Sequence, residues 1–282
     1  MESWPPPLRQ LRRWLVDPPA ISSFEWIPNK TFASSLPFLS ATVVCYLSLT
    51  VLLHRRLLPL PFPPPATLRL LSAAHNLFIL LLSATMAAGA SLSALAQMPS
   101  PRWLLCFPTS TPARGPIFFW AQIFYISKIY EFADTALILL AGGRRLSFLH
   151  VYHHAAVVVM CYLWLSTAQS LLPIALVTNA SVHVVMYAYY LSASLGRPWR
   201  RRWKRGLTLL QIVQFVFSFT VSGGFLWLHF AGGGCEGMKG WIFNAAFNAS
   251  LLALFQDFYS AAYSGAASAT SGGGMEVKRS FN

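Results

Sequence analysis

Three histidines stand close together in an otherwise apolar stretch of the chain, at positions 150, 153 and 154. Because an α-helix brings residues three and four apart onto one face, His150, His153 and His154 would point in the same direction. An imidazole can move protons or attack a carbonyl carbon as a nucleophile. Titratable side chains at membrane depth are costly and by default indicate a functional site. The spacing therefore predicts an enzyme with a membrane-embedded active site.

Three further polar stripes follow helical spacing in neighbouring apolar segments. They comprise Lys128, Glu131, Asp134 and Thr135; Asn179, His183, Met186, Tyr187 and Tyr190; and Thr208, Gln211 and Gln214. Each stripe covers one face of a helix, so four helices are expected to share an interior cavity. The structural alternative is that single polar residues join membrane helices through hydrogen bonds. Four histidines together with a lysine and two carboxylates favour a functional role over this alternative.

The composition indicates that a membrane positions these helices. Hydrophobic residues make up 55% of the 282 residues and charged residues 10%, whereas a soluble domain carries about 25% charged residues. Several apolar runs exceed the roughly 18 residues that mark a membrane span. We expect an all-α polytopic membrane protein with seven transmembrane helices. The expected spans are 35–53, 70–94, 117–140, 148–166, 170–193, 206–230 and 240–263.

The spans define one catalytic domain over residues 35–263, with a segment on either side. Residues 1–34 are expected to form a non-cytosolic N-terminal segment with an interfacial helix, because Leu8, Leu11 and Leu15 alternate with arginines. Residues 264–282 are small, polar and glycine-rich. This composition predicts a disordered tail.

Basic residues predict the orientation of the spans. They concentrate after the first, third and fifth spans and near the C-terminus, with Arg144, Arg145 and residues 197–205 as the densest groups. The positive-inside rule places these segments in the cytosol, so the N-terminus is expected on the non-cytosolic side and the C-terminus in the cytosol. The formal net charge of +13 is then largely a topology signal, although basic loops also attract anionic ligands.

The four cysteines fall into two groups on this map. Cys45 and Cys161 lie within spans, where a thiol packs as a small apolar group. Cys106 and Cys235 fall in the non-cytosolic loops 95–116 and 231–239, where a disulfide can persist in an oxidising compartment. We predict that they pair, two free thiols being the alternative. Asn29, in the sequence Asn-Lys-Thr, is a candidate glycosylation site on the same side.

The order and spacing of the polar motifs resemble one known family. The motifs are Lys128-x-x-Glu131-x-x-Asp134-Thr135, His150-x-x-His153-His154, Asn179-x-x-x-His183-x-x-Met186-Tyr187-x-Tyr189-Tyr190 and Thr208-x-x-Gln211-x-x-Gln214-Phe215. Together they resemble the ELO family, the fatty-acid elongase condensing enzymes of the endoplasmic reticulum, with features similar to plant members. Two departures are the Ala-Leu-Ile after Thr135, where the family usually has a Phe two places on, and a tail without a dilysine retrieval signal.

This resemblance implies a fold and a reaction. The fold is an inverted barrel of six helices around an acyl channel, with a seventh helix outside. The reaction is condensation of a long-chain acyl-CoA with malonyl-CoA to give 3-ketoacyl-CoA, carbon dioxide and CoA, without a cofactor or metal. The implied setting is the endoplasmic reticulum membrane, with the N-terminus lumenal. The implied partners are the ketoacyl-CoA reductase, dehydratase and enoyl reductase of the elongation cycle; whether the chain is a monomer or a homodimer stays open.

The resemblance also assigns roles to residues. His153 would carry the acyl group, with His183 facing it, while His150 and His154 would orient it, move protons or stabilise an enolate. The expected substrate-binding residues are Lys128, Glu131, Asp134, Asn179, Tyr187, Gln211, Gln214, Arg201 and Arg202. Among these, Arg201 and Arg202 belong to the basic loop that would meet the phosphates of CoA.

Two other functions are consistent with parts of the pattern. A membrane di-iron desaturase or hydroxylase also uses HxxHH boxes, but such enzymes resemble one another in having about eight histidine ligands, and this chain has seven histidines in all. A seven-span transporter or receptor would explain buried charges, but not four ordered motifs. Both alternatives predict no turnover of malonyl-CoA.

Overall fold

The computed structural model describes residues 5–58, 63–142 and 146–264. These residues fold into helices without a named strand, and a single isolated bridge joins Glu25 to Arg114. The helices are α1 Pro6–Leu15, α2 Pro19–Ser22, α3 Leu36–His54, α4 Pro65–Gln97, α5 Pro116–Tyr130, α6 Phe132–Leu140, α7 Phe148–Ser166, α8 Leu172–Ser194, α9 Arg201–Ala231 and α10 Met238–Tyr259, with the short turns η1 Pro101–Leu104 and η2 Ser260–Ser264. Each of the seven expected spans is thus largely helical. Arg144, Arg145 and the expected tail after residue 264 lie outside the described residues.

The helix starts carry recognisable capping residues. Ser35 caps α3 by accepting a hydrogen bond from the backbone N–H of Phe38 at 3.3 Å, and Ser147 caps α7 by accepting one from His150 at 3.2 Å. Proline occupies the first turn of α4 and of α5. A serine cap satisfies an otherwise free N–H group, and proline fits the first turn because it lacks one. The cap at Ser147 therefore fixes where the histidine helix begins.

The expected third span is divided at Glu131. The helix α5 ends at Tyr130 and α6 begins at Phe132, and the N–H of Asp134 bonds to the carbonyl of Glu131 at 3.0 Å. A bond to the third residue back marks a tighter turn than that of an α-helix. Lys128 and Asp134 consequently flank a local change in winding instead of lying on one regular helix.

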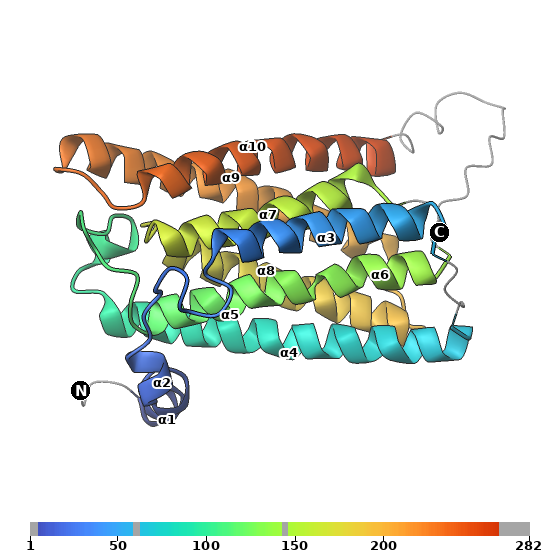
Figure 1. Ribbon diagram of the computed structural model, residues 1–282, viewed down its shortest axis with the longest axis horizontal. Coiled ribbons are helices and arrows are strands. Elements are labelled where there is room, and N and C mark those ends of the chain that lie inside the picture. Colours follow the sequence, from blue (N-terminus) through green and yellow to red (C-terminus); the bar gives the residue numbers. More distant parts are fainter. Residues whose placement is uncertain (1–4, 59–62, 143–145, 265–282) are drawn as a thin grey trace.

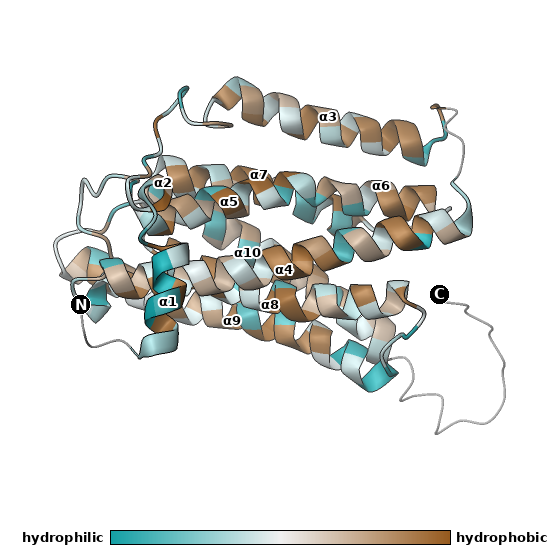
Figure 2. Cartoon of the chain, turned by 90° about the horizontal axis from the view of Figure 1, so that it is seen from below, coloured by the Kyte–Doolittle hydropathy of each residue, from teal (hydrophilic) through white to brown (hydrophobic). Residues whose placement is uncertain are grey.

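The long helices pack side by side in a bundle (Figure 1). Helix α4 packs against α5 and α8, α5 against α7, α7 against α10, α10 against α9, and α9 against α8, so the contacts return to α4. Helix α3 contacts α6 and α7 and lies on the outer side of the bundle (Figure 2). The helices that carry the polar stripes therefore surround a common interior.

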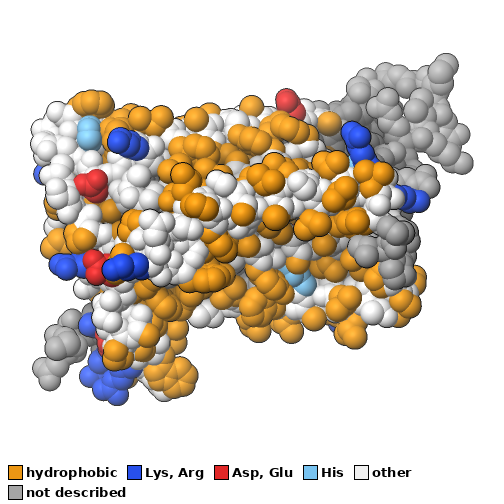
Figure 3. Space-filling model, viewed as in Figure 1, with side chains coloured by type: hydrophobic (Ala, Val, Ile, Leu, Met, Phe, Trp, Pro, Cys, Tyr) orange, Lys and Arg blue, Asp and Glu red, His pale blue; other side chains and the backbone are white. Residues whose placement is uncertain are grey.

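The outer surface has the character of a membrane protein. Within the described residues, five helices are long and apolar enough to cross a membrane, namely α3, α4, α7, α8 and α9. Helices α5 and α6 are each too short on their own. Hydrophobic side chains cover the middle of the visible face, and lysine and arginine side chains gather towards its two ends (Figure 3).

The basic segment 197–205 is only partly a loop. We expected the sixth span to start at residue 206, but α9 begins at Arg201. Arginine and lysine are good helix formers, and their long side chains can reach polar surroundings from a helix that extends beyond the apolar layer. Similarly, Arg69 lies within α4, which starts at Pro65 instead of residue 70.

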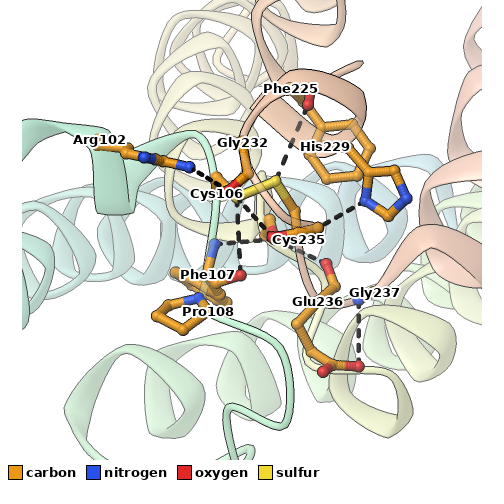
Figure 4. The surroundings of a disulfide bond; sticks show 12 residues. Arg102, Cys106, Phe107, Pro108, Phe225, His229, Gly232, Cys235, Glu236 and Gly237 are labelled. Atoms are coloured by element: carbon orange, nitrogen blue, oxygen red, sulfur yellow. Dashed lines mark hydrogen bonds between the residues drawn. A yellow bond between two sulfur atoms is a disulfide. The ribbon is translucent and has the colours of Figure 1, made fainter. Parts of the chain in front are cut away.

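One end of the bundle, which we call the disulfide end, is closed by connected loops. Cys106 and Cys235 form a disulfide there, with their Cα atoms 5.1 Å apart (Figure 4). The N–H of Glu236 donates to the carbonyl of Phe107 at 2.9 Å. Ser170 joins the α7–α8 turn to both loops, because its hydroxyl accepts from the N–H of Phe107 at 3.0 Å and donates to the carbonyl of Glu236 at 2.7 Å. The expected pairing of the two loops is therefore present.

Helix α1 runs across the direction of the long helices near this same end (Figures 1 and 2). It contacts α4, and the indole N–H of Trp120 donates to the carbonyl of Leu15 at 2.9 Å. Trp14 points outward with 70% of its surface exposed. Asn29, the candidate glycosylation residue, is also exposed near this end. A crosswise helix with an outward tryptophan has the form of an interfacial helix.

Candidate active site

A cavity of about 670 Å³ lies inside the bundle. It is lined by residues of α6, α7, α8, α9 and α10, together with Ser72 and Asn76 of α4. It extends from Lys204 and Tyr263, at what we call the Lys204 end, to Trp164 and Leu171 towards the disulfide end. Most of the residues expected from sequence line it: Glu131, Asp134, His150, His153, His154, Asn179, His183, Tyr187, Gln211 and Gln214.

Lys128 lies behind the residues that line the cavity, and it forms a buried cluster with two of those residues. Its Nζ is 2.8 Å from Oε1 of Glu131 and 3.1 Å from Nδ1 of His183. Lys128 and Glu131 are each 1% exposed. A buried ion pair offsets the cost of removing two charges from water only when its geometry is good and further hydrogen bonds are made. The cluster therefore orients His183 but leaves Lys128 without contact with the cavity.

Asp134 is held by two side chains from other helices. Its Oδ1 lies 2.9 Å from Nε2 of His75, and its Oδ2 accepts a hydrogen bond from the hydroxyl of Tyr187 at 2.6 Å. Tyr187 is 1% exposed and His75 is 6% exposed. The hydroxyl proton of Tyr187, which we expected to hold a substrate oxygen, is thus already donated to Asp134.

His150 is connected to the outer helix through a hydroxyl chain. Its Nε2 lies 2.9 Å from Oγ1 of Thr135, which in turn lies 3.0 Å from the hydroxyl of Tyr46 on α3. Either hydroxyl can donate or accept. The chain fixes the orientation of the His150 ring at the wall of the cavity.

The other two histidines of the box are less constrained. The buried Nδ1 atoms of His153 and His154 have no hydrogen-bond partner in the described part of the chain, and neither does Oδ1 of Asn179. The ring of His153 lies against the ring of Phe247, with centroids 6.1 Å apart. A buried polar atom without a partner is uncommon in a native protein and requires an explanation. Unpaired polar atoms beside a cavity are consistent with groups that act on a bound substrate.

Two expected substrate-binding residues lie outside the cavity lining. Arg201 donates to the carbonyl of Ala262 at 3.4 Å, and the guanidinium of Arg202 lies 5.7 Å from the centre of the Trp203 ring. Both are exposed. Lys204, from the same basic segment, does line the cavity. Neighbours on a helix point in different directions, which explains why one member of the segment faces inward and the others do not.

Several cavity residues were not predicted. Asn244 and Asn248 of α10 face the cavity from one helix side. Asn244 accepts a hydrogen bond from the indole of Trp164 at 3.2 Å, and Asn248 donates to Ser218 at 3.1 Å. Their spacing of four residues was a usable signal. His75 and Tyr46 do not line the cavity but bond to Asp134 and Thr135, and they carry no comparable signal because each is a single polar residue in an apolar segment.

The part of the chain that the structure describes contains no group of three or more His, Cys, Asp or Glu side chains placed to hold a metal ion. The polar groups that line the cavity can supply an imidazole nucleophile, hydrogen-bond donors and proton acceptors. Such a set, in a cavity that is also lined by apolar side chains, suits the transfer of an acyl group from a thioester.

Comparison with known proteins gives a consistent result. The family model described as ELO, GNS1/SUR4 family, matches residues 31–271. A protein of Arabidopsis thaliana named fatty acid elongase 3-like is 27% identical over 274 residues, which cover 89% of this chain and 91% of that protein. Fatty acid elongase sre1 of Dictyostelium discoideum is 34% identical over 200 residues, 69% of this chain and 72% of that protein. Very long chain fatty acid elongase 5 of Rattus norvegicus is 34% identical over 148 residues, covering 50% of this chain and 46% of that protein.

Proposed function

Because the chain belongs to the ELO (GNS1/SUR4) family, whose members among its relatives are named fatty acid elongases, we propose that it catalyses the condensation step of fatty acid elongation. The substrates are a long-chain acyl-CoA and malonyl-CoA, and the products are 3-ketoacyl-CoA, carbon dioxide and CoA. The observation that carries the proposal is the imidazole of His153, which lines the interior cavity and whose buried Nδ1 has no partner among the described residues.

The proposed reaction passes through an acyl-histidine. A ring nitrogen of His153 attacks the thioester carbon of acyl-CoA, the carbon–sulfur bond breaks, and CoA leaves with a proton. Malonyl-CoA then loses carbon dioxide, and the electron pair of the broken carbon–carbon bond forms the enolate of acetyl-CoA. The enolate carbon attacks the acyl carbon, the acyl carbon–nitrogen bond breaks, and the released ring nitrogen of His153 takes up one proton from solvent, which restores the neutral imidazole. Dividing the reaction into two displacements lowers the barrier of each one, and neither displacement needs a cofactor or metal.

The cavity offers groups for the other charges of this reaction. His150 and His154 adjoin His153 on α7, and we propose that they orient it and transfer protons. Asn179, Gln211 and Gln214 line the cavity and can donate to thioester or malonyl oxygens. Donors aimed at developing negative charge act strongly where water is excluded.

The proposed membrane arrangement follows from the packing. We propose that seven segments span the membrane, with α5 and α6 forming one span and with α3 outside a six-helix inverted barrel. The contacts that return from α9 through α8 to α4 support the barrel. The domain would cover residues 35–263, preceded by a lumenal segment with an interfacial helix and followed by a cytosolic tail.

The orientation and partners are part of the same proposal. The basic Lys204 end would face the cytosol, where CoA substrates are available, and the disulfide end would face the lumen of the endoplasmic reticulum. The 3-keto product must be reduced and dehydrated before another cycle. We therefore propose a ketoacyl-CoA reductase, a dehydratase and an enoyl reductase as partners in the same membrane. The proposal leaves open whether the protein forms a homodimer.

The test is an assay of the purified full-length protein in detergent. Long-chain acyl-CoA and radiolabelled malonyl-CoA are supplied without added metal or reductant. We expect the label in a chain-extended 3-ketoacyl-CoA when a retained malonyl carbon is labelled. When the carboxyl carbon that is lost is labelled, we expect the label in carbon dioxide. Absence of product over a range of acyl lengths, from protein shown to be folded, would contradict the proposal; iron in that preparation would then favour a desaturase.

A further inference from the structure

His183 faces the cavity with one ring nitrogen and a buried lysine with the other. Its Nδ1 lies 3.1 Å from Nζ of Lys128, while the residue lines the cavity wall. Among the described residues, the His183 ring makes one hydrogen bond, at Nδ1, and none at Nε2. Nε2 is therefore the nitrogen left to act on a bound substrate.

The chemistry of the lysine determines which of the two nitrogens carries the proton. Nζ of Lys128 is 2.8 Å from Oε1 of Glu131 and 4.4 Å from the centre of the Phe124 ring. Both contacts are those that a lysine ammonium makes, since it donates to a carboxylate and lies over the negative face of an aromatic ring. An ammonium has three donors and no acceptor. Nδ1 of His183 must consequently accept, and a neutral imidazole that accepts at Nδ1 carries its hydrogen on Nε2.

We propose that Lys128 is a positioning residue that fixes His183 in the Nε2–H form, so that His183 donates a hydrogen bond to substrate oxygen and is neither the nucleophile nor a base. This inference rests on the proposed function. The oxygen would be that of the acyl thioester or of the enolate formed from malonyl-CoA, on which negative charge develops. A donor fixed before the reaction needs no reorganisation when that charge appears.

His153 differs from His183 in this respect. Its Nδ1 is buried without a partner in the described residues, so no lysine forces its proton onto Nε2. The two histidines therefore have different roles. His153 offers an available lone pair, and His183 offers a fixed N–H. The sequence motifs alone do not separate these roles, because both residues are histidines on polar stripes.

Glu131 makes the role of Lys128 testable. Its Oε1 lies 3.7 Å from Nδ1 of His183, close enough to become a partner when the lysine is absent. A carboxylate accepts hydrogen bonds, so removal of the ammonium should shift the imidazole hydrogen to Nδ1. Nε2 would then present a lone pair towards the substrate, and the hydrogen bond to its oxygen would be lost.

The first experiment replaces His183 with side chains whose amide nitrogen can stand in for one of its two ring nitrogens. The amide nitrogen of His183→Gln can occupy the place of Nε2, whereas that of His183→Asn can occupy the place of Nδ1. We expect His183→Asn and His183→Ala to lose about 10²–10³ in kcat, the loss typical of one oxyanion donor, and His183→Gln to regain at least tenfold of it. All three should still form an acyl-enzyme from acyl-CoA alone, located on His153 by mass spectrometry.

Two outcomes would overturn the inference. The first is that the His183→Gln variant is as inactive as His153→Ala and forms no acyl-enzyme, although gel filtration and melting temperature show that it is folded. The other is an acyl group found on His183. If the wild-type protein itself did not condense malonyl-CoA, the proposed function would fail instead, and the protonation site of His183 would still be measurable.

The second experiment reads that protonation site without activity. Nitrogen-15 spectra of histidine-labelled protein distinguish an N–H from an unprotonated ring nitrogen. We expect the His183 signals, assigned by their loss in His183→Gln, to show hydrogen on Nε2 in wild type and in Lys128→Arg, and on Nδ1 in Lys128→Met. Lys30→Met, at an exposed lysine near the disulfide end, is the matched control and should leave these signals unchanged. Hydrogen on Nδ1 in the wild-type protein would overturn the inference even if Lys128→Met does not fold.

Discussion

The hydroxyl of Tyr187 donates to Oδ2 of Asp134 at 2.6 Å, which joins the middle of α8 to the start of α6. Oδ1 of the same carboxylate lies 2.9 Å from His75 on α4. Three helices are thus connected through one carboxylate at the edge of the cavity. Because both oxygens of Asp134 have partners, the residue is better suited to holding helices and rings in place than to taking a proton from substrate.

Tyr187→Phe should reveal this connecting role. The substitution leaves Asp134 with one partner fewer, and hydrogen bonds to charged groups contribute about 1.5–3 kcal/mol. We expect a lower melting temperature in detergent and a reduced kcat with little change in KM, because the bond positions groups of the protein and does not bind substrate directly. Tyr162→Phe is the control, since the Tyr162 hydroxyl has no hydrogen bond in the described chain. Unchanged stability of Tyr187→Phe would refute the assignment.

His153→Ala should abolish condensation and leave the protein folded. The side chain is the proposed acyl carrier and makes no hydrogen bond within the described residues, so its removal deletes the nucleophile without breaking a polar contact. Malonyl-CoA condensation and acyl-enzyme formation are measured together, with melting temperature as a check on folding. His54→Ala, at the exposed end of α3, should retain full activity. If His153→Ala turned over substrate at the wild-type rate, that result would contradict the acyl-histidine mechanism.

The sequence predicted the helices and their inward faces better than it predicted their partners. Apolar length and helical period are local properties, so the segments and the stripe containing His150, His153 and His154 could be recognised without a structure. The partners of the stripes depend on how each helix is rotated and where it ends. Thr135 meets Tyr46 and Asp134 meets His75 across long sequence separations, and isolated polar residues in apolar helices give no signal of such contacts.

Cys106→Ser should lower stability without removing the catalytic groups. The disulfide joins residues 129 positions apart, and closing a loop of about 100 residues restricts an unfolded chain by about 4.7 kcal/mol in the loop-entropy model. Because helices persist in an unfolded membrane protein, we expect about 2–4 kcal/mol, observed as a lower melting temperature. The mobility difference between reduced and non-reduced gels should also disappear. Cys45→Ser, at a free exposed cysteine, should change neither, and a retained mobility difference in Cys106→Ser would contradict the pairing.

Lys204→Ala should weaken acyl-CoA binding more than replacement of its basic neighbours. Lys204 lines the Lys204 end of the cavity, whereas Arg201 and Arg202 do not. One lost contact between the exposed Lys204 ammonium and a phosphate, worth about 0.2–1 kcal/mol, corresponds to a rise in apparent KM of about 1.4-fold to fivefold. The measurement compares Lys204→Ala with the double variant Arg201→Ala, Arg202→Ala at fixed ionic strength. A larger rise in the double variant would place the phosphates outside the cavity mouth.

Trp164→Ala should allow longer acyl chains to be elongated. Trp164 lies on α7 eleven residues beyond His153, about 16 Å along the helix axis, and its indole donates to Oδ1 of Asn244 on the neighbouring helix α10. It lines the cavity and is 2% exposed, so its ring occupies space that a longer chain would need. Removing it opens that space and costs about 3–5 kcal/mol of stability. Product lengths are compared by mass spectrometry with Trp164→Phe, which keeps most of the bulk and should preserve the wild-type distribution. Products of unchanged length from folded Trp164→Ala would show that the acyl chain ends before reaching Trp164 or runs in another direction.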